Sequence, residues 1–194
     1  MHRGKGKEER AEIGGNMLAG QDLVVAGRIA QTGLKKAAAQ SMELLSTRFT
    51  ASYIKSAVQV TALLPKEDKI WRQAGADALL FAGEGGIFAC LWELASLFQK
   101  GFTVELQQIP VRQSTIELCE VMGLNPYRLE SGECALFTAD NGQDAARFLR
   151  ERGIEAAWIG KVDKGISCRI LNDGKQGFLE RPTRDEMYKV IKTT

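Results

Sequence analysis

The chain has 194 residues, 44% of them hydrophobic and 26% charged, and its 26 basic and 24 acidic side chains give a formal net charge of +2. This length and composition are typical of one ordinary globular domain, and they exclude extensive disorder. The near balance of charge disfavours a nucleic-acid-binding surface. No apolar run reaches the roughly 18 residues that a membrane span needs, and no secretory leader is recognisable, so we expect a cytoplasmic protein.

The first half of the chain alternates apolar runs with helix-forming stretches. Residues 1–19 are basic and then glycine-rich, which predicts a flexible lead before a domain over residues 20–194. A buried strand is predicted over 22–27, followed by helices over 34–45 and 50–64. Thr50 is the expected N-cap of the second helix, and Pro65 ends it. A short helix over 66–73 and a buried strand over 77–81 complete this half.

The second half alternates more regularly. A helix that begins near Gly85 carries apolar residues around more than half of its circumference, which predicts the central helix of the core. Strands over 102–106, 133–138 and 156–162 alternate with helices over 113–122 and 142–152. Asp173-Gly174 predicts a hairpin with arms at 167–171 and 176–179, and a last helix is expected over 184–192. This order favours an α+β domain with a mixed sheet in α/β/α layers.

Residue types used in metal binding and acid–base catalysis are sparse. The four cysteines are far apart and lie among apolar neighbours, so we expect core residues rather than zinc ligands (Cys90, Cys119, Cys134 and Cys168). The only histidine, His2, lies in the N-terminal lead, where little would order it. We therefore assign no catalytic residue and no metal ligand.

A run of three glycines and a glutamate lies where a buried strand is expected to pass into the central helix. Glycine lets the backbone approach a ligand closely, and the unpaired N–H groups at a helix start attract anions. We predict anion binding by Gly83, Glu84, Gly85 and Gly86, with Glu84 assisting if the ligand carries an amine. The alternative is a plain strand-to-helix turn, in which Glu84 only interacts favourably with the helix dipole.

Four segments, spread in order over most of the chain, resemble the carboxy-terminal domain of the superfamily of aminoimidazole ribonucleotide (AIR) synthetase and the hydrogenase expression/formation protein. They are 22–27 with Gly33, 84–95, 109–113 with 117–126, and 159–160 with 181–182 and 185–189. The resemblance implies that domain's layered fold, which is in part ferredoxin-like. It also implies that the ATP-binding motifs and magnesium carboxylates belong to an amino-terminal half, which the residues before the first strand are too few to build.

The chain departs from the family pattern at the predicted anion site. Relatives commonly read His-Asp-x-Thr-Glu-Gly-Gly where residues 80–86 read Leu-Phe-Ala-Gly-Glu-Gly-Gly. The loop after the first strand has Ala30 where relatives often have glycine, although Gly27 and Gly33 remain. The missing polar side chains disfavour the family's chemistry. The retained glycines, with Arg112 as a possible clamp, still predict that an anion is bound.

Two functions follow from these observations. The first is a stand-alone carboxy-terminal domain that binds a phosphorylated or carboxylated small molecule or acts as a regulatory module, without complete catalytic machinery. The second is the carboxy-terminal half of an ATP-dependent synthetase or hydrogenase-maturation-like enzyme, with ATP and Mg²⁺ entering only through a separate amino-terminal half. We expect no cofactor on this chain alone, and a partner that is either that half or a second copy. An exposed apolar face on the helices of residues 34–64 would mark the interface.

Overall fold

The computed structural model of the chain describes residues 12–60 and 64–190. Eight strands in this part of the chain form one sheet: β1 (Glu12–Ile13), β2 (Asp22–Ala26), β3 (Leu79–Phe81), β4 (Phe102–Glu105), β5 (Ala135–Ala139), β6 (Ala156–Val162), β7 (Cys168–Asn172) and β8 (Lys175–Phe178). Their order is β1-β3-β5-β2-β6-β4-β7-β8. All neighbours pair antiparallel except β4 and β7, which are parallel. The predicted mixed sheet is confirmed.

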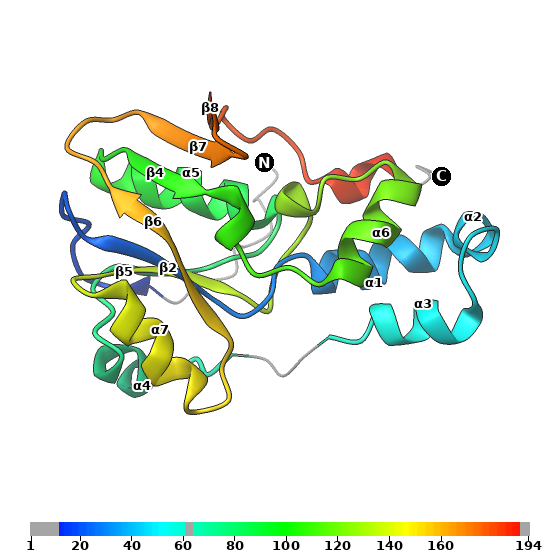
Figure 1. The fold of residues 1–194 in the computed structure, drawn as a ribbon, viewed down its shortest axis with the longest axis horizontal. Helices are drawn as coiled ribbons and strands as arrows, with labels where there is room; N and C mark the ends of the chain where they lie inside the picture. The colour runs from blue at the N-terminus through cyan, green and yellow to red at the C-terminus, as the bar shows by residue number, and fades with distance from the viewer. Residues whose placement is uncertain (1–11, 61–63, 191–194) are drawn as a thin grey trace, which may run out of the picture.

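Helices cover both faces of the sheet and extend past one end of it (Figure 1). They are α1 (Gln31–Gln40), α2 (Met42–Ser46), α3 (Ala51–Ala57), α4 (Asp68–Gln73), α5 (Gly86–Phe98), α6 (Gln113–Met122) and α7 (Gly142–Arg150), with short 3₁₀ turns η1 (Leu106–Gln108), η2 (Pro126–Arg128) and η3 (Glu186–Lys189). α5 lies on one face, and α4 and α7 lie on the other (Figure 1). α1, α2, α3 and α6 form a lobe at the end of the sheet. The α/β/α layering is therefore as predicted.

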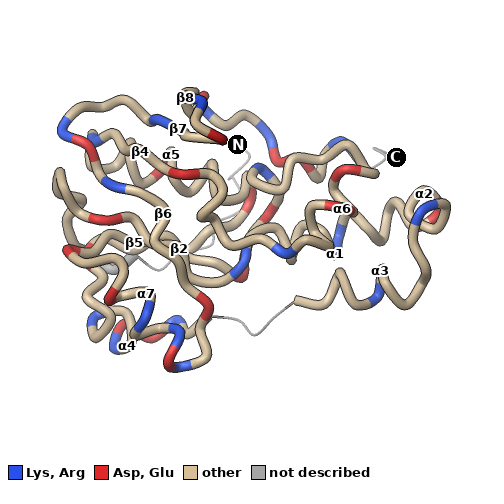
Figure 2. The backbone as a smooth tube through the Cα atoms, viewed as in Figure 1, with Lys and Arg blue, Asp and Glu red and all other residues tan. Residues whose placement is uncertain are grey.

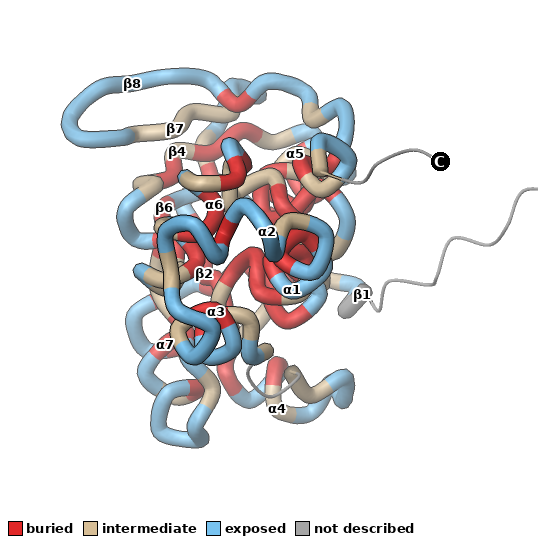
Figure 3. Tube along the Cα trace, turned by 90° about the vertical axis from the view of Figure 1, so that its right-hand side faces the viewer, coloured by how far each residue is buried: buried red, intermediate tan, exposed pale blue. Residues whose placement is uncertain are grey.

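The centre of the sheet is buried on both faces, as the burial colours of Figure 3 show. In β2, Leu23 and Val25 belong to the core on the α5 side, whereas Val24 and Ala26 belong to the core beneath α4 and α7. Alternate side chains of a strand point to opposite faces, so a strand that is covered twice needs a continuous apolar run. This explains why the sequence at 22–27 reads as a buried strand without polar alternation.

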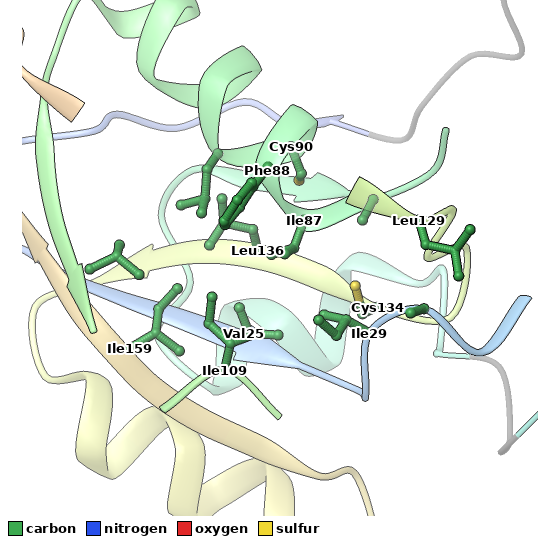
Figure 4. Packing of buried hydrophobic residues seen from close by; sticks show 14 of the residues in the cluster. Val25, Ile29, Ile87, Phe88, Cys90, Ile109, Leu129, Cys134, Leu136 and Ile159 are labelled. Carbon is green, nitrogen blue, oxygen red and sulfur yellow. The ribbon is translucent and has the colours of Figure 1, made fainter. Parts of the chain in front are cut away.

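α5 is the central helix of the larger core, as its apolar circumference predicts. Ile87 and Phe88 point from this helix toward Leu136 and Val25 of the sheet (Figure 4). On the opposite face, Trp71 of α4 fills the smaller core. The two cores together bury most of the large apolar side chains in the described residues, so the domain does not depend on a disulfide or a metal for its stability.

The cysteines behave as core residues. Cys90, Cys119 and Cys134 are buried and Cys168 is half-buried, all as free thiols. Burial raises the pKa of Cys119 to about 12, with a further contribution from the charge of Glu186. The raised pKa keeps this thiol protonated, so it is a poor nucleophile.

Several predicted helix ends are wrong. The helix expected over 34–45 begins three residues earlier and is interrupted at Ser41, whose backbone leaves the helical region. Thr50 does cap α3 through its hydroxyl, but that helix ends at Ala57 rather than near Pro65; residues 61–63 lie outside the described part. The last predicted helix is reduced to the short turn η3, and residues 191–192 also lie outside the description.

Ordered structure begins earlier than the expected boundary near residue 20. β1 pairs with β3, Met17 is buried in the larger core, and the Asn16 N–H donates to Asp77 Oδ1 over 2.9 Å. Residues 12–19 are therefore attached to the domain, so the flexible lead predicted for 1–19 is wrong for this part. Residues 1–11, with His2, lie outside the described residues.

Acidic and basic side chains are interspersed over the described elements (Figure 2). Among those elements, no helix is both long enough and apolar enough to cross a lipid bilayer.

Asp22 joins β2 to the start of α7. Its Oδ2 accepts the Gly142 N–H over 2.8 Å, and its Oδ1 accepts from Lys161 Nζ over 2.6 Å. Burial opposes ionisation of this carboxyl, but the bonds from Lys161 and the Gly142 N–H outweigh it, so its pKa is lowered from 3.8. The ionised form is therefore the one that stabilises the fold.

We expect Asp22→Asn to lower the free energy of unfolding by about 1–2 kcal/mol at neutral pH. Because the folded pKa is below the unfolded one, this contribution is present above the unfolded value and is lost as the pH falls through the folded value. Urea denaturation of both proteins at about pH 7 and about pH 2.5 measures it. Asp68→Asn, at an exposed pair with Arg72, is the control and should cost less than about 0.5 kcal/mol. An equal loss at both pH values would contradict the assignment.

Candidate functional site

Two of the predicted site glycines approach the same short segment from opposite sides. A Cβ added to Gly86 at the start of α5 would lie 2.6 Å from the carbonyl oxygen of Leu129 and 2.7 Å from that of Tyr127. A Cβ added to Gly33 in α1 would lie 2.6 Å from Leu129 Cγ, and the Gly33 N–H donates to the Glu130 carbonyl over 3.0 Å. The structure therefore brings these glycines together, but residues 127–130 of the chain itself occupy the space between them.

The N–H groups predicted to bind an anion are already used. Gly85 and Gly86 have left-handed backbones, with φ of 79° and 65°, and both are buried. The Gly85 N–H donates to Asp185 Oδ2 over 2.7 Å, and the Gly86 N–H donates to the Gly83 carbonyl over 3.0 Å. At Gly85 the Asp185 carboxylate of the same chain lies where the anion was expected, and the binding of an anion by residues 83–86 stays a prediction.

Asp185 is only 3% exposed and connects two elements. Its Oδ1 accepts the Met187 N–H over 2.8 Å and so caps η3, as the acidic start of the last helix predicts. Burial raises the pKa of this carboxyl despite its two backbone hydrogen bonds, and the charges of Glu130 and Glu84 raise it further. Glu84 is exposed, and its hydrogen bond with Tyr188 raises the pKa of that phenol. The start of α5 is thus acidic, which disfavours a second anion.

The loop between β2 and α1 is built in the same way. Glu133, 1% exposed, accepts the Gln31 N–H over 2.5 Å and the Thr32 N–H over 3.1 Å, and the Thr32 hydroxyl donates to it as well. Burial raises the pKa of Glu133, although the bonds from Thr32 and Gln31 oppose that effect. Ala30 adopts a left-handed φ of 68°, and its N–H donates to Ser131 Oγ over 2.8 Å.

Gly27 belongs to this loop but does not face a ligand. Its N–H donates to the Glu155 carbonyl over 2.7 Å, and an added Cβ would lie 2.3 Å from the Glu133 carbonyl oxygen. Sequence reasoning missed Glu133, because a glutamate at the start of a predicted strand carries no sign that its side chain turns back to cap a helix about 100 residues earlier.

Arg112 is directed at the protein backbone. Its Nη1 donates to the Gln59 carbonyl over 2.7 Å, which holds the segment that follows α3 against the start of α6. This bond uses one of the five N–H donors of the guanidinium, so the anion clamp predicted for Arg112 stays a prediction.

A groove of about 660 Å³ runs beside α5, and sequence reasoning did not predict it. It is lined by Ala89, Trp92, Glu93, Ser96, Leu97, Arg181 and Pro182. Trp92 is half-buried, so it packs against the core on one side and forms part of the groove wall on the other. The groove combines one aromatic wall with one cation, but it is shallow and open.

Within the part of the chain that the structure describes, no three His, Cys, Asp or Glu side chains are grouped to hold a metal ion. The backbone N–H groups of Gly85 and Gly86, which could otherwise contact a phosphate, have acceptors within the chain. We therefore derive no catalytic step for this chain alone.

No family model matches the chain. Among curated proteins, the carbamoyl dehydratase HypE of Rhizobium leguminosarum bv. viciae is 37% identical over 82 residues, which make up 40% of this chain and 23% of that protein. Phosphoribosylformylglycinamidine synthase subunit PurL of Caldanaerobacter subterraneus subsp. tengcongensis is 29% identical over 98 residues, which are 48% of this chain and 12% of that protein.

Solved structures share the fold over most of the chain. HypE in a HypE–HypF complex has a TM-score of 0.69 at 19% identity, covering 86% of this chain and 54% of that one. Escherichia coli HypE gives 0.68 at 19% identity, covering 90% and 54%. Thiamine-monophosphate kinase of Stenotrophomonas maltophilia K279a gives 0.61 at 18% identity, covering 83% and 52%.

The chain therefore shares the fold of HypE and of thiamine-monophosphate kinase, and part of it is similar in sequence to HypE and PurL. It covers about half the length of the solved structures that it matches. The layered α+β fold expected from the resemblance is confirmed, and it is the fold of the carboxy-terminal domain of these proteins.

The close approach of Gly86 to segment 127–130 can be tested against Gly123, which has a similar backbone but free space around it. We expect Gly86→Ala to destabilise the domain by about 2 kcal/mol more than Gly123→Ala. Both glycines have φ between 65° and 68°, but an added Cβ at Gly123 meets nothing within 4 Å. Urea denaturation gives the two costs, and equal costs would show that backbone strain alone explains the glycine at position 86.

The occupation of the α5 start by Asp185 can be tested with inorganic phosphate. We expect Asp185→Ala to cost about 1–2 kcal/mol and to make the melting temperature rise with phosphate, because the Gly85 N–H is then free. The wild type and Asp173→Ala, which changes an exposed turn, should show no such rise when ionic strength is matched with chloride. Equal stabilisation of the wild type by phosphate would show that the turn at 83–86 is open after all.

Proposed function

We propose that this chain supplies the carboxy-terminal half of an ATP-dependent enzyme of the AIR synthase-related superfamily. The other half is an ATP-binding domain, on the same polypeptide or on a separate one. The observation that carries the proposal is coverage: the chain matches solved HypE structures over 86–91% of its own length but only 54–57% of theirs. One of those structures is of HypE in complex with ATP, and a related kinase structure, AaThiL, is complexed with AMPPCP and TMP.

The geometry favours this role over a stand-alone anion-binding module. A module of that kind needs free main-chain N–H groups at its glycines, and at Gly85 and Gly86 both are bonded within the chain. An anion would have to displace the Asp185 carboxylate in the presence of Glu84 and Glu130, whose charges oppose it. Chemistry on ATP therefore has to draw its phosphate and magnesium ligands from the other half.

The helical lobe offers a surface for that half. Met42 and Leu44 of α2 and Ile116 of α6 are exposed, and these two helices contact each other. Exposed large apolar residues on neighbouring helices are typical of interaction surfaces. Met42 and Leu44 lie on the helices of residues 34–64, where the apolar face was expected, whereas Ile116 lies outside that range on α6. These three side chains are the basis for placing the interface there.

We test the proposal with the purified chain and the amino-terminal half of Rhizobium leguminosarum HypE. We expect the two to associate, and Leu44→Asp to raise the dissociation constant at least about tenfold because a charge would be desolvated in the interface. Leu97→Asp is the matched control: Leu97 is 56% exposed on α5, Leu44 is 48% exposed on α2, and both are leucines on helices. Isothermal titration calorimetry measures both.

ATP provides the second measurement. We expect no saturable binding of Mg–ATP by the chain alone, and hydrolysis only when the amino-terminal half is added. Hydrolysis by the unaided chain would overturn the proposal. So would the absence of any association when both proteins are folded, or an equal effect of the two leucine variants.

A further inference from the structure

β8 is the outermost strand of the sheet on one side, and all four of its residues are exposed. Figure 3 shows β8 at the margin of the domain, while β7 pairs with β4. The hairpin turns at Asp173 and Gly174, whose φ values of 53° and 74° are those of the two-residue turn that the sequence predicts. The hairpin therefore presents a regular edge rather than an irregular loop.

The register shows which main-chain groups of β8 face outward. The Leu179 N–H donates to the Cys168 carbonyl over 2.8 Å, so this pair is hydrogen-bonded. Hydrogen-bonded and non-hydrogen-bonded pairs alternate along an antiparallel ladder. The pairs Arg169–Phe178 and Leu171–Gln176 are therefore of the second kind. The N–H and C=O groups of Phe178 and Gln176 point away from β7, toward the open edge.

The side chains of this edge are also unusual. Phe178 is 65% exposed and lies on the same face as Arg169, whose guanidinium is bonded to Thr103 and Asp163. α7 contacts β2, β5 and β6, so the helix layer on this face lies over the other part of the sheet. Natural edge strands are commonly protected by short length, charges, proline or bulges. β8 is four residues long and begins with Lys175, but its last three residues read Gln-Gly-Phe. Phe178 therefore exposes an aromatic ring beside an unpaired strand edge, and pairing with another strand would bury it.

We propose that β8 pairs antiparallel with β8 of a second copy of this chain, about a two-fold axis at Phe178. In this register Phe178 lies opposite the partner's Phe178, and Gln176 lies opposite the partner's Glu180. Phe178 and Gln176 have their main-chain groups facing outward, so their N–H and C=O groups can bond to the second copy in this register. Glu180 lies two residues past the end of β8. The register joins two exposed aromatic rings and sets an amide beside a carboxylate, and both are favourable cross-strand pairs.

A second copy fits this edge better than an unrelated strand, because the same outward-facing N–H and C=O groups supply the donors and acceptors on both copies. An axis at Gly177 would also use outward-facing groups, but it would place each Phe178 opposite Gln176 and leave the rings without aromatic partners. A pairing of one short strand buries little area, so we expect a weak dimer with a dissociation constant in roughly the micromolar range. This inference is independent of the enzyme role proposed above, because it uses no residue of α2 or α6.

Sedimentation equilibrium of the wild type should show a concentration-dependent dimer. Phe178→Pro removes an outward N–H and the ring but none of the β7–β8 hydrogen bonds, so we expect at least about a tenfold weaker dimer with little change in melting temperature. Phe178→Tyr keeps both features and should dimerise like the wild type. Ile166→Ser removes another apolar side chain, which is 79% exposed but lies outside β8, and should have no effect.

Cross-linking tests the register directly. Hydrogen-bonded partners have Cα atoms about 5.5 Å apart, which suits a disulfide. Phe178→Cys should therefore form a covalent dimer on mild oxidation, while Gln176→Cys should not, because its partner across the axis is Glu180. A wild type that stays monomeric, a dimer insensitive to Phe178→Pro, or faster cross-linking at 176 than at 178 would overturn the proposal.

Discussion

In the described part of the chain, three helices begin against a carboxylate from a distant part of the sequence. Glu133 caps α1, Asp185 caps α5 and Asp22 caps α7, with sequence separations of 102, 100 and 120 residues for the Gln31, Gly85 and Gly142 N–H groups. The first N–H groups of a helix have no partner within it, and these helix starts are buried away from water. An anion also interacts favourably with the positive end of the helix dipole. The same three contacts therefore complete the helices and fix their positions on the sheet.

This arrangement explains why the glycine turns look like ligand cradles. Left-handed glycines, a helix start and close backbone approach are the features of an anion site, and all of them are present at Gly85 and Gly86. The anion is Asp185, and the group that approaches closely is the backbone of residues 127–130. Close packing of the chain against itself accounts for these glycines as parts of the fold. The surfaces left for other molecules are then the exposed side chains of the helical lobe and the bare edge of the sheet.

The sequence was most informative where local and tertiary preferences agree. The bounds of α6 and β6 match the predicted ranges, because each is an apolar pattern bounded by turn residues. The helix predicted over 184–192 fails because Asp185 turns its carboxylate toward Gly85 as well as capping η3, so its contacts are not only local. The open anion site predicted at residues 83–86 differs from the structure for a related reason. A glycine shows that something comes close, but the sequence does not say whether that is a ligand, a helix or the backbone of residue 129.

The Asp185 carboxylate that caps α5 lies about 100 residues after the start of that helix, so it is synthesised much later. A ribosome releases residues 86–98 long before it has synthesised residue 185, so the emerging helix lacks the acceptor that completes its first turn. In the same way, the first turn of α1 lacks its acceptor until Glu133 has been synthesised. Elements near the middle of the polypeptide therefore gain their final stability only when later residues arrive. The domain should mature as one cooperative unit after synthesis of residue 185, rather than element by element from the N-terminal end.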